Sequence, residues 1–210
     1  MSQFDSFFLV CLTTLFSIVN PLGALGPFLA MTANDGKDKR LITAKRSSVV
    51  SFLVLMVCAS VGTFIFQFYG ISLPAVKIAG GILLFLVALD MINARQSRTK
   101  STAEEAEEGV EKEDVAIFPL AIPLISGPGS IVSVFILAER AQSLLHHFYL
   151  YLAIAVTMLG VFLILRSGHE IARWLGKIGI NVFSRLMGLV LAAIAIQFVI
   201  DGLVAVWTSV

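Results

Sequence analysis

The stretch "SIVNPLGALGPFLAMT", residues 17–32, places helix-breaking residues inside a segment that is long enough to cross a membrane. It holds two prolines, two glycines and an asparagine, yet no charged residue occurs from 6 to 34. About 20 apolar residues span the hydrocarbon core of a bilayer as a helix. An unpaired backbone group is costly there, so broken backbone survives only where protein buries it or it lines a polar cavity. The stretch therefore predicts a binding site built from backbone at a broken membrane helix.

Composition places the chain in a membrane. Of its 210 residues, 58% are hydrophobic and 14% are charged, which makes the chain more apolar and less charged than an average soluble domain. Uncharged runs at 6–34, 47–76 and 115–138 are each longer than one span requires. A formal net charge of +1 gives no reason to expect a nucleic-acid partner. The expected partners are the lipid bilayer and a small substrate, and the oligomeric state stays open.

Uncharged length and helix breakers together predict an all-α chain with six transmembrane helices. We expect spans at 6–32, 46–69, 73–93, 115–139, 148–168 and 184–207. The segment 95–114 is polar, acidic and free of aromatic residues, which predicts a solvated and mostly disordered linker. The predicted organisation is therefore a first three-span repeat at 1–94, this linker, and a second three-span repeat at 115–210.

Basic residues are distributed asymmetrically among the expected loops. The first, third and fifth loops hold every lysine and arginine except Lys77 and Arg140, counting Arg185 at the end of the fifth. Cytoplasmic loops of membrane proteins carry an excess of Lys and Arg. We therefore expect these loops, including 95–114, in the cytoplasm and both termini outside.

The two halves of the chain resemble each other. Residues 20–23 (NPLG) correspond to 127–130 (GPGS), and the Gly-Ile pair at 70–71 returns at 179–180, at nearly the same offset. Because each half has three spans, an odd number, the second half is expected to cross the membrane upside down relative to the first. Inverted repeats of this kind are typical of secondary transporters that work by alternating access.

The first predicted break lies at an Asn-Pro pair. Pro21 has no backbone donor and its ring clashes with the carbonyl of Ser17, so the helix should stop near Val19. Asn20 is a good N-cap and proline is favoured at the first helical position, so the same pair can start a new helix. Gly23 then lets another chain approach closely. A structural kink is the alternative, and a matching break in the other half disfavours it.

The fourth span repeats this pattern. Ser126 or Gly127 is the expected cap, Pro128 takes the first helical position and Gly129 follows. At 1.5 Å per residue the first break lies about 21 Å from Ser6, and the second about 20 Å from the start of its span. Because the two spans enter from opposite faces, both breaks are expected near the midplane.

Two such breaks predict a zwitterionic ligand. A helix start presents free N–H groups and the positive end of a dipole, which suit a carboxylate. The end of the preceding helix presents free carbonyls, which suit an ammonium group or a coupling cation. Asn20 and Ser126 add side-chain oxygens, and glycine crowding leaves room for a short side chain only. We therefore expect a small neutral amino acid such as glycine, alanine or serine.

The chain resembles the MarC family of bacterial and archaeal inner-membrane proteins. The resemblance rests on "NPLG", "IAGGILLFLVALDMI", "PLAIPLISGPGS" and "RLMGLVLAAIAIQFVIDGL", and it covers the chain apart from 95–114. It implies six spans in two inverted repeats with discontinuous first and fourth helices, and some members transport small neutral amino acids. Coupling to a proton or sodium gradient follows by analogy only. The substrate-binding residues that it implies are Asn20, Pro21, Gly23, Ser126, Gly127, Pro128 and Gly129.

Four further polar residues are candidates for gating or coupling. Asp90 and Asp201 lie near the ends of the third and sixth expected spans, where either proton coupling or simple placement at the membrane interface would account for them. Gln197 lies in an apolar run and is expected to find a partner inside the bundle, at a gate or another helix. Ser17 lies one turn before the first break and can bond freed carbonyls.

Motifs for other functions are missing from the sequence. Cys11 and Cys58 have no metal-binding spacing, and "HEIAR" at 169–173 lacks the second histidine of a zinc protease. No GxxxxGK[ST] loop occurs, so ATP is not the expected energy source. We expect no enzyme and no cofactor. Export of amphipathic drugs and a membrane scaffold without transport remain the alternatives, and transport direction stays open.

Overall fold

The computed structural model describes residues 3–93 and 116–208, and all elements in these ranges are helical. The predicted 95–114 linker lies outside the described residues. The elements are α1 (Gln3–Val19), α2 (Pro21–Met31), α3 (Lys37–Phe68), α4 (Leu73–Ile92), the π-helical η1 (Ala116–Ile125), α6 (Pro128–Arg140), α7 (Leu144–Arg166) and α8 (Gly168–Thr208).

The predicted all-helical, multi-pass architecture is confirmed. Five helical segments of the described chain are long and apolar enough to cross a membrane: Ser6–Met31, Lys37–Gly62, Leu73–Ile92, Leu144–Arg166 and Ile178–Thr208. A sixth forms if η1 and α6, which meet at an angle of 56°, count as one broken span. Because α1 and α2 together make one of the five, the interruption at Asn20 lies inside a span.

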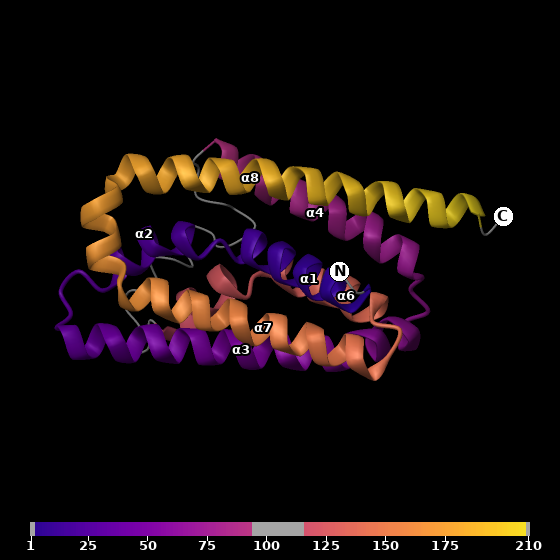
Figure 1. Ribbon diagram of the computed structural model, residues 1–210, viewed down its shortest axis with the longest axis horizontal. Helices are drawn as coiled ribbons and strands as arrows, with labels where there is room; N and C mark the ends of the chain where they lie inside the picture. The colour runs from indigo at the N-terminus through magenta and orange to yellow at the C-terminus, as the bar shows by residue number, and fades with distance from the viewer. Residues whose placement is uncertain (1–2, 94–115, 209–210) are drawn as a thin grey trace.

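The helices run mostly along the long axis of the molecule in three layers (Figure 1). The helices α4 and α8 lie side by side along one edge, and α3 and α7 lie along the other. Between them run α1 with α2, and η1 with α6. The segments α1–α2 and η1–α6 therefore occupy the middle of the bundle.

The buried apolar side chains form two clusters. The larger joins the central helices to α3 and α7, with Leu15 and Leu137 among its fully buried members. The smaller joins α4 and α8 to the middle layer through Ile18 and Ile136. Large apolar residues on the outer faces of α3, α7 and α8 are exposed, as expected where lipid replaces water around a protein.

Small residues let α4 and α8 approach closely. A Cβ atom added to Gly81 of α4 would lie 2.6 Å from the carbonyl oxygen of Ala195 in α8. One added to Gly188 of α8 would lie 2.9 Å from Cβ of Met91. These contacts resemble the small-residue interfaces by which membrane helices pack.

The fifth loop differs from the prediction. Sequence reading placed a loop before a span at 184–207, with Arg185 at its end. The structure continues the helix from Gly168, turns it at Gly176 (φ 63°, ψ 176°) and starts the last span near Ile178. Figure 1 shows the first part of α8 crossing the end of the bundle. Arg185 therefore lies within the last span, because the positive φ at Gly176 turns the chain without a longer loop.

Candidate functional site

The first interruption is centred on Asn20. Its backbone is left-handed (φ 46°, ψ 70°), and its side-chain oxygen accepts a hydrogen bond of 3.2 Å from the backbone N–H of Gly23. Its amide nitrogen donates to the hydroxyl of Ser184 on α8, at 3.3 Å. The predictions of Asn20 as N-cap and Pro21 as first helical residue are confirmed. Asn20 is 5% exposed, so this cap lies within the bundle and ties α2 to α8.

Gly23 gives the Asn20 side chain its room. A Cβ atom at Gly23 would lie 2.1 Å from the amide nitrogen of Asn20 and 3.2 Å from the hydroxyl oxygen of Ser184. No side chain fits at the first of these distances. The capping contact therefore requires glycine here. The close approach that the sequence predicted is thus made mainly by the Asn20 side chain of the same segment, with Ser184 of α8 next to it.

The second interruption begins inside η1. Phe118 and Ile122 have extended backbone there, and the peptide bond between Ile122 and Pro123 is cis. The carbonyl of Ala121 accepts hydrogen bonds from the backbone N–H and the hydroxyl of Ser126, at 2.9 and 2.8 Å. A hydroxyl of α3, that of Ser51, donates to the same carbonyl at 3.4 Å. Buried serines thus satisfy backbone that the broken helix leaves unpaired.

The start of α6 keeps its backbone donors. Of the two caps that the sequence allowed, Gly127 is the N-cap and Ser126 is not, because the Ser126 hydroxyl points back to Ala121. Within 3–93 and 116–208, no side chain caps this helix. The first N–H groups of a helix lack an intrahelical acceptor, and those of Gly129 and Ser130 have no side-chain cap among the described residues. Pro128 at the first helical position is exposed, whereas Pro21 is buried.

The two interruptions lie side by side. A Cβ atom at Gly129, in the first turn of α6, would lie 3.7 Å from a methyl carbon of Ile18, two residues before Asn20. Ser126, Gly127, Gly129 and Asn20 are all buried. The fold therefore brings the end of α1 into contact with the start of α6, although these segments are far apart along the chain.

Ser133 is a polar residue of this region that sequence reasoning missed. Its hydroxyl is buried and has no hydrogen-bond partner among the described residues. Ser130, one turn earlier, donates to the carbonyl of Ile125 at 3.0 Å. The sequence did contain a signal for Ser130 and Ser133. Residues 126, 129, 130 and 133 recur at helical spacing, which places small and polar residues along one helix face.

The gating candidates Gln197 and Asp201 lie away from the interruptions. Asp201 pairs with Arg140 at the end of α6 and accepts a hydrogen bond of 2.6 Å from the Gln197 amide. The guanidinium carbon of Arg140 lies 5.3 Å from the ring centre of Phe198. The expectation that Gln197 finds its partner inside the bundle is wrong, because its side chain is exposed and its partner is one turn along the same helix.

The other two candidates are placed differently. Ser17 is buried in the last turns of α1, next to the first interruption. Asp90 is half-buried near the end of α4. No group of three His, Cys, Asp or Glu side chains in the described residues could hold a metal ion. The arrangement at the interruptions is thus made of backbone groups, one amide and several hydroxyls, without a charged side chain.

Comparisons with known proteins agree with this membrane architecture. Residues 5–207 match the model of the MarC family integral membrane protein. A UPF0056 membrane protein of Methanocaldococcus jannaschii is 37% identical over 197 residues, which is 94% of this chain and 96% of the relative. A UPF0056 membrane protein of Pyrococcus abyssi is 40% identical over 196 residues (93% and 94%). The UPF0056 membrane protein YhcE of Escherichia coli is 34% identical over 189 residues (90% and 88%).

No solved structure matches the chain. The family match and the relatives nevertheless extend over nearly its whole length. The chain therefore belongs to the MarC family of integral membrane proteins.

Proposed function

We propose that this protein is a secondary transporter of small neutral amino acids of the glycine, alanine and serine class. The observation that carries the proposal is the meeting of two proline-containing helix interruptions from different halves of the chain, next to an uncapped helix start. Interrupted helices at the middle of a bundle are how many secondary transporters bind their substrates.

The polar groups suit a zwitterion. The N–H groups of Gly129 and Ser130 and the positive end of the α6 dipole would bind the carboxylate. The hydroxyl of Ser133, which has no partner among the described residues, lies one turn further along. Pro21 has no N–H for the carbonyl of Ser17, so the end of α1 offers an acceptor to the ammonium group. Ile18 and Leu84, which flank Gly129, are buried, and we expect their bulk to restrict the substrate to a short side chain.

Helix packing supports the proposed inverted repeat. The first span (α1 with α2) packs against α7 and α8, while the fourth (η1 with α6) packs against α3 and α4. The third and last spans, α4 and α8, pack against each other. Exchanging the two halves maps this pattern onto itself, as a two-fold axis between the halves requires. With three spans in each half, such an axis lies in the membrane plane.

Transport would require the two repeats to move relative to each other. Asn20, Ser126 and Gly129 are buried, although Pro128 is exposed, so a substrate would reach the buried polar groups only after the bundle opens. We propose that one repeat rocks against the other and that a proton or sodium gradient drives the cycle. In the topology that goes with this proposal, both termini lie outside the inner membrane and 95–114 lies in the cytoplasm.

Uptake into proteoliposomes tests the proposal. Purified protein is reconstituted and uptake of radiolabelled glycine and alanine is measured with no gradient, a proton gradient or a sodium gradient. We expect uptake that follows one gradient and that unlabelled alanine suppresses. Folded protein that moves neither amino acid under any gradient would contradict the proposal, and export of amphipathic dyes by the same vesicles would favour drug efflux.

A further inference from the structure

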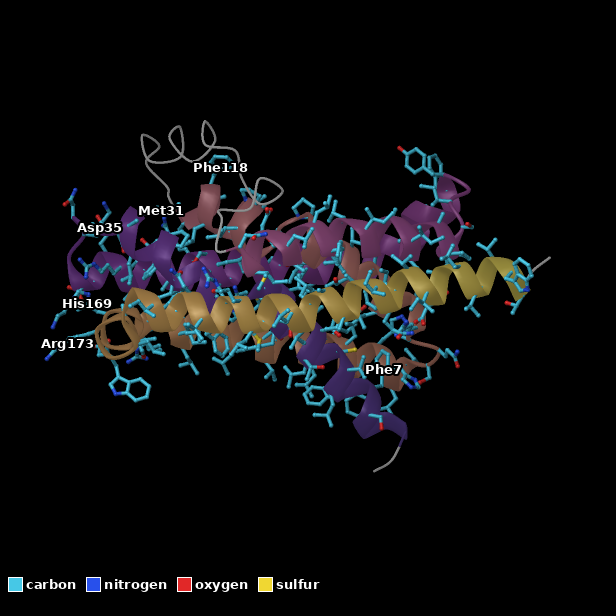
Figure 2. The ribbon with its side chains drawn as sticks, turned by 90° about the horizontal axis from the view of Figure 1, so that it is seen from above. Phe7, Met31, Asp35, Phe118, His169 and Arg173 are labelled. Atoms are coloured by element: carbon cyan, nitrogen blue, oxygen red, sulfur yellow. The ribbon has the colours of Figure 1, made fainter. Side chains whose placement is uncertain are left out.

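A hollow lined by basic side chains lies at one end of the bundle, where α2 leads into α3 and α7 leads into α8. We call it the basic pocket. Its volume is about 480 Å³, and a second hollow of about 420 Å³ adjoins it and shares Arg40, His169 and Arg173 with it. Figure 2 shows His169 and Arg173 at this end of the molecule, together with Asp35. The charged side chains that line the pocket are Lys37, Asp38, Arg40, Arg166, Glu170 and Arg173.

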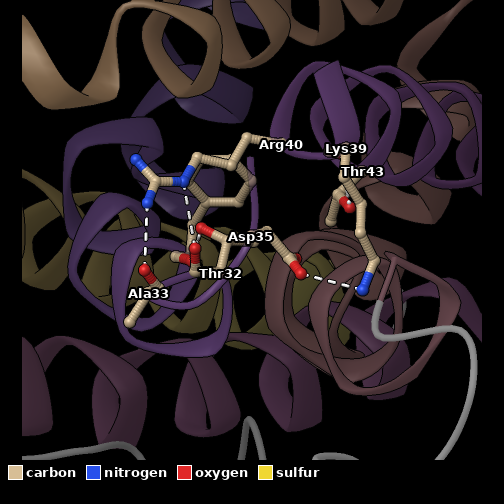
Figure 3. A network of polar contacts seen from close by, with 7 residues as sticks. Thr32, Ala33, Asp35, Lys39, Arg40 and Thr43 are labelled. Atoms are coloured by element: carbon tan, nitrogen blue, oxygen red, sulfur yellow. Dashed lines mark hydrogen bonds and ion pairs between the residues drawn. The ribbon is translucent and has the colours of Figure 1, made fainter. Parts of the chain in front are cut away.

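Arg40 is held in place within the pocket. Its Nε donates to the carbonyl of Thr32 and one terminal nitrogen donates to the carbonyl of Ala33, both at 3.0 Å (Figure 3). These carbonyls belong to the end of α2, so the guanidinium closes that helix and links it to α3. Its other terminal nitrogen has no hydrogen bond within the described chain, and remains available to an anion.

The basic pocket holds more cations than anions. Lys37, Arg166 and Arg173 form no ion pair within the part of the chain that the structure describes. Lys39 lies outside the pocket and does pair, with Asp35 at 2.8 Å. Four basic side chains thus face two acidic ones, and the excess positive potential favours an anionic ligand.

The surroundings of the basic pocket are apolar and exposed. Trp174, which follows Arg173 in the chain, is 87% exposed, and Ile178, just after the turn at Gly176, is 81% exposed. Leu41 and Ile42, beside Arg40 on α3, are exposed as well. Exposed apolar residues next to cations at the end of a membrane bundle mark the membrane–water interface, and tryptophan prefers that depth. The pocket therefore opens at the level of lipid headgroups.

We propose that the basic pocket binds the phosphate group of an anionic phospholipid. Arginine presents paired N–H donors that match phosphate oxygens, and basic pockets between membrane helices suit such headgroups. The pocket lies between corners from the two halves of the chain, so one bound lipid would bridge them. This site goes beyond the proposed transport function, and its test requires no transport.

The two tryptophans of the chain allow a local test. Trp174 directly follows Arg173 of the basic pocket in the chain, and Trp207 lies at the other end of α8, whose course Figure 1 shows. Trp207→Phe protein is reconstituted in phosphatidylcholine with a graded fraction of phosphatidylglycerol brominated on its acyl chains, which quenches nearby tryptophan. We expect Trp174 to be quenched more strongly than the mole fraction of brominated lipid in the bilayer would give by chance contact. In Trp174→Phe protein, Trp207 should be quenched in proportion to that fraction.

Two double variants that each remove two positive charges distinguish lipid binding in the pocket from electrostatic attraction of lipid to the whole basic surface. Arg166→Gln with Arg173→Gln should weaken the selectivity at Trp174 for phosphatidylglycerol roughly tenfold or more, since both cations line the pocket. Lys39→Gln with Lys45→Gln removes two charges from the same end but outside the pocket, and should leave selectivity unchanged. Arg173→Gln alone replaces the first pair if that variant does not purify as a monodisperse protein.

Three results would overturn the proposal. The first is quenching of Trp174 in proportion to mole fraction, which shows no preference for the anionic lipid. The second is an equal loss in the two charge-removal variants, which shows attraction to the surface as a whole. The third is loss of the excess quenching when millimolar inorganic phosphate or glycerol 3-phosphate is added, which assigns the pocket to a soluble phosphate compound.

Discussion

At the scale of single residues, the hydroxyl of Ser133 is the sharpest test of the proposed substrate site. It is buried without a partner among the described residues, so Ser133→Ala should not lower stability, because the side chain loses no hydrogen bond of the protein. If the hydroxyl binds substrate carboxylate, the KM for glycine uptake should rise roughly three- to tenfold, which corresponds to one lost hydrogen bond. Uptake kinetics and thermal unfolding of the same preparation measure both effects.

The matched control is Thr157→Ala on α7. That hydroxyl is equally buried, but it donates to the carbonyl of Ala153 at 2.8 Å within its own helix. The substitution should leave KM unchanged. A similar rise in KM for the two variants would remove Ser133 from the site and leave a general packing effect as its role.

Gly23 supplies a second prediction at this scale. In Gly23→Ala the new methyl group would displace the Asn20 side chain, which then loses both its cap of α2 and its bond to Ser184. Loss of an N-cap costs about 0.5–2 kcal/mol, so we expect a lower unfolding temperature. Gly26→Ala is the control, because a Cβ atom added there would have no neighbour within 4 Å and alanine favours helix. Equal unfolding temperatures in the two variants would contradict the role of Gly23.

Local rules explain which residues of the site were predictable. The cap at Asn20 and the helix start at Pro21 follow from residue type and order alone. The Ser126 hydroxyl could serve its own helix start or an earlier carbonyl, and sequence order does not decide between them. The partners Ser184 and Arg140 come from other helices and carry no local signal.

At the scale of elements, the lengths of the uncharged runs predicted most spans, but they gave the wrong end of the fifth loop and therefore the wrong start of the last span. Residues 168–175 include enough polar residues to resemble a loop. In the structure they form the first part of α8, and Gly176 turns the chain between this part and the last span. The bend between η1 and α6 was predictable as a break because Pro119, Pro123 and Pro128 lie close together. The angle of this bend could not be predicted, because neighbouring helices determine how far a broken helix bends.

The contact between α4 and α8 yields a prediction about these elements. In Gly81→Ala the added methyl group would press on backbone, the carbonyl of Ala195 at 2.6 Å, which cannot rotate away. Overpacking of this kind typically costs about 1–3 kcal/mol, so thermal unfolding in detergent should occur at a clearly lower temperature. Gly160→Ala in α7 is the control, because its nearest contact, Phe16, lies at an ordinary 3.5 Å. An unchanged unfolding temperature for Gly81→Ala would show that α4 and α8 separate easily.

At the scale of the whole molecule, basic residues gather at one end of the bundle. The corner between α2 and α3 and the corner between α7 and α8 both lie there, and they supply all the cations of the basic pocket. Gln142, in the connection between α6 and α7, lies at the opposite end of α7. The charge bias and the fold thus agree on which connections share a side of the membrane, and the bias predicts that the basic side is the cytoplasm.

Cysteine labelling in intact cells tests this topology. In protein carrying Cys11→Ala and Cys58→Ala, a cysteine is introduced by Lys39→Cys or by Gln142→Cys, both at exposed positions. An impermeant maleimide added outside should label the position-142 variant and leave the position-39 variant unlabelled, because the basic corners lie in the cytoplasm. Labelling both variants after detergent lysis shows that each thiol is reactive. The reverse pattern in intact cells would reverse the orientation, because α1 begins and α8 ends on the side opposite the basic corners.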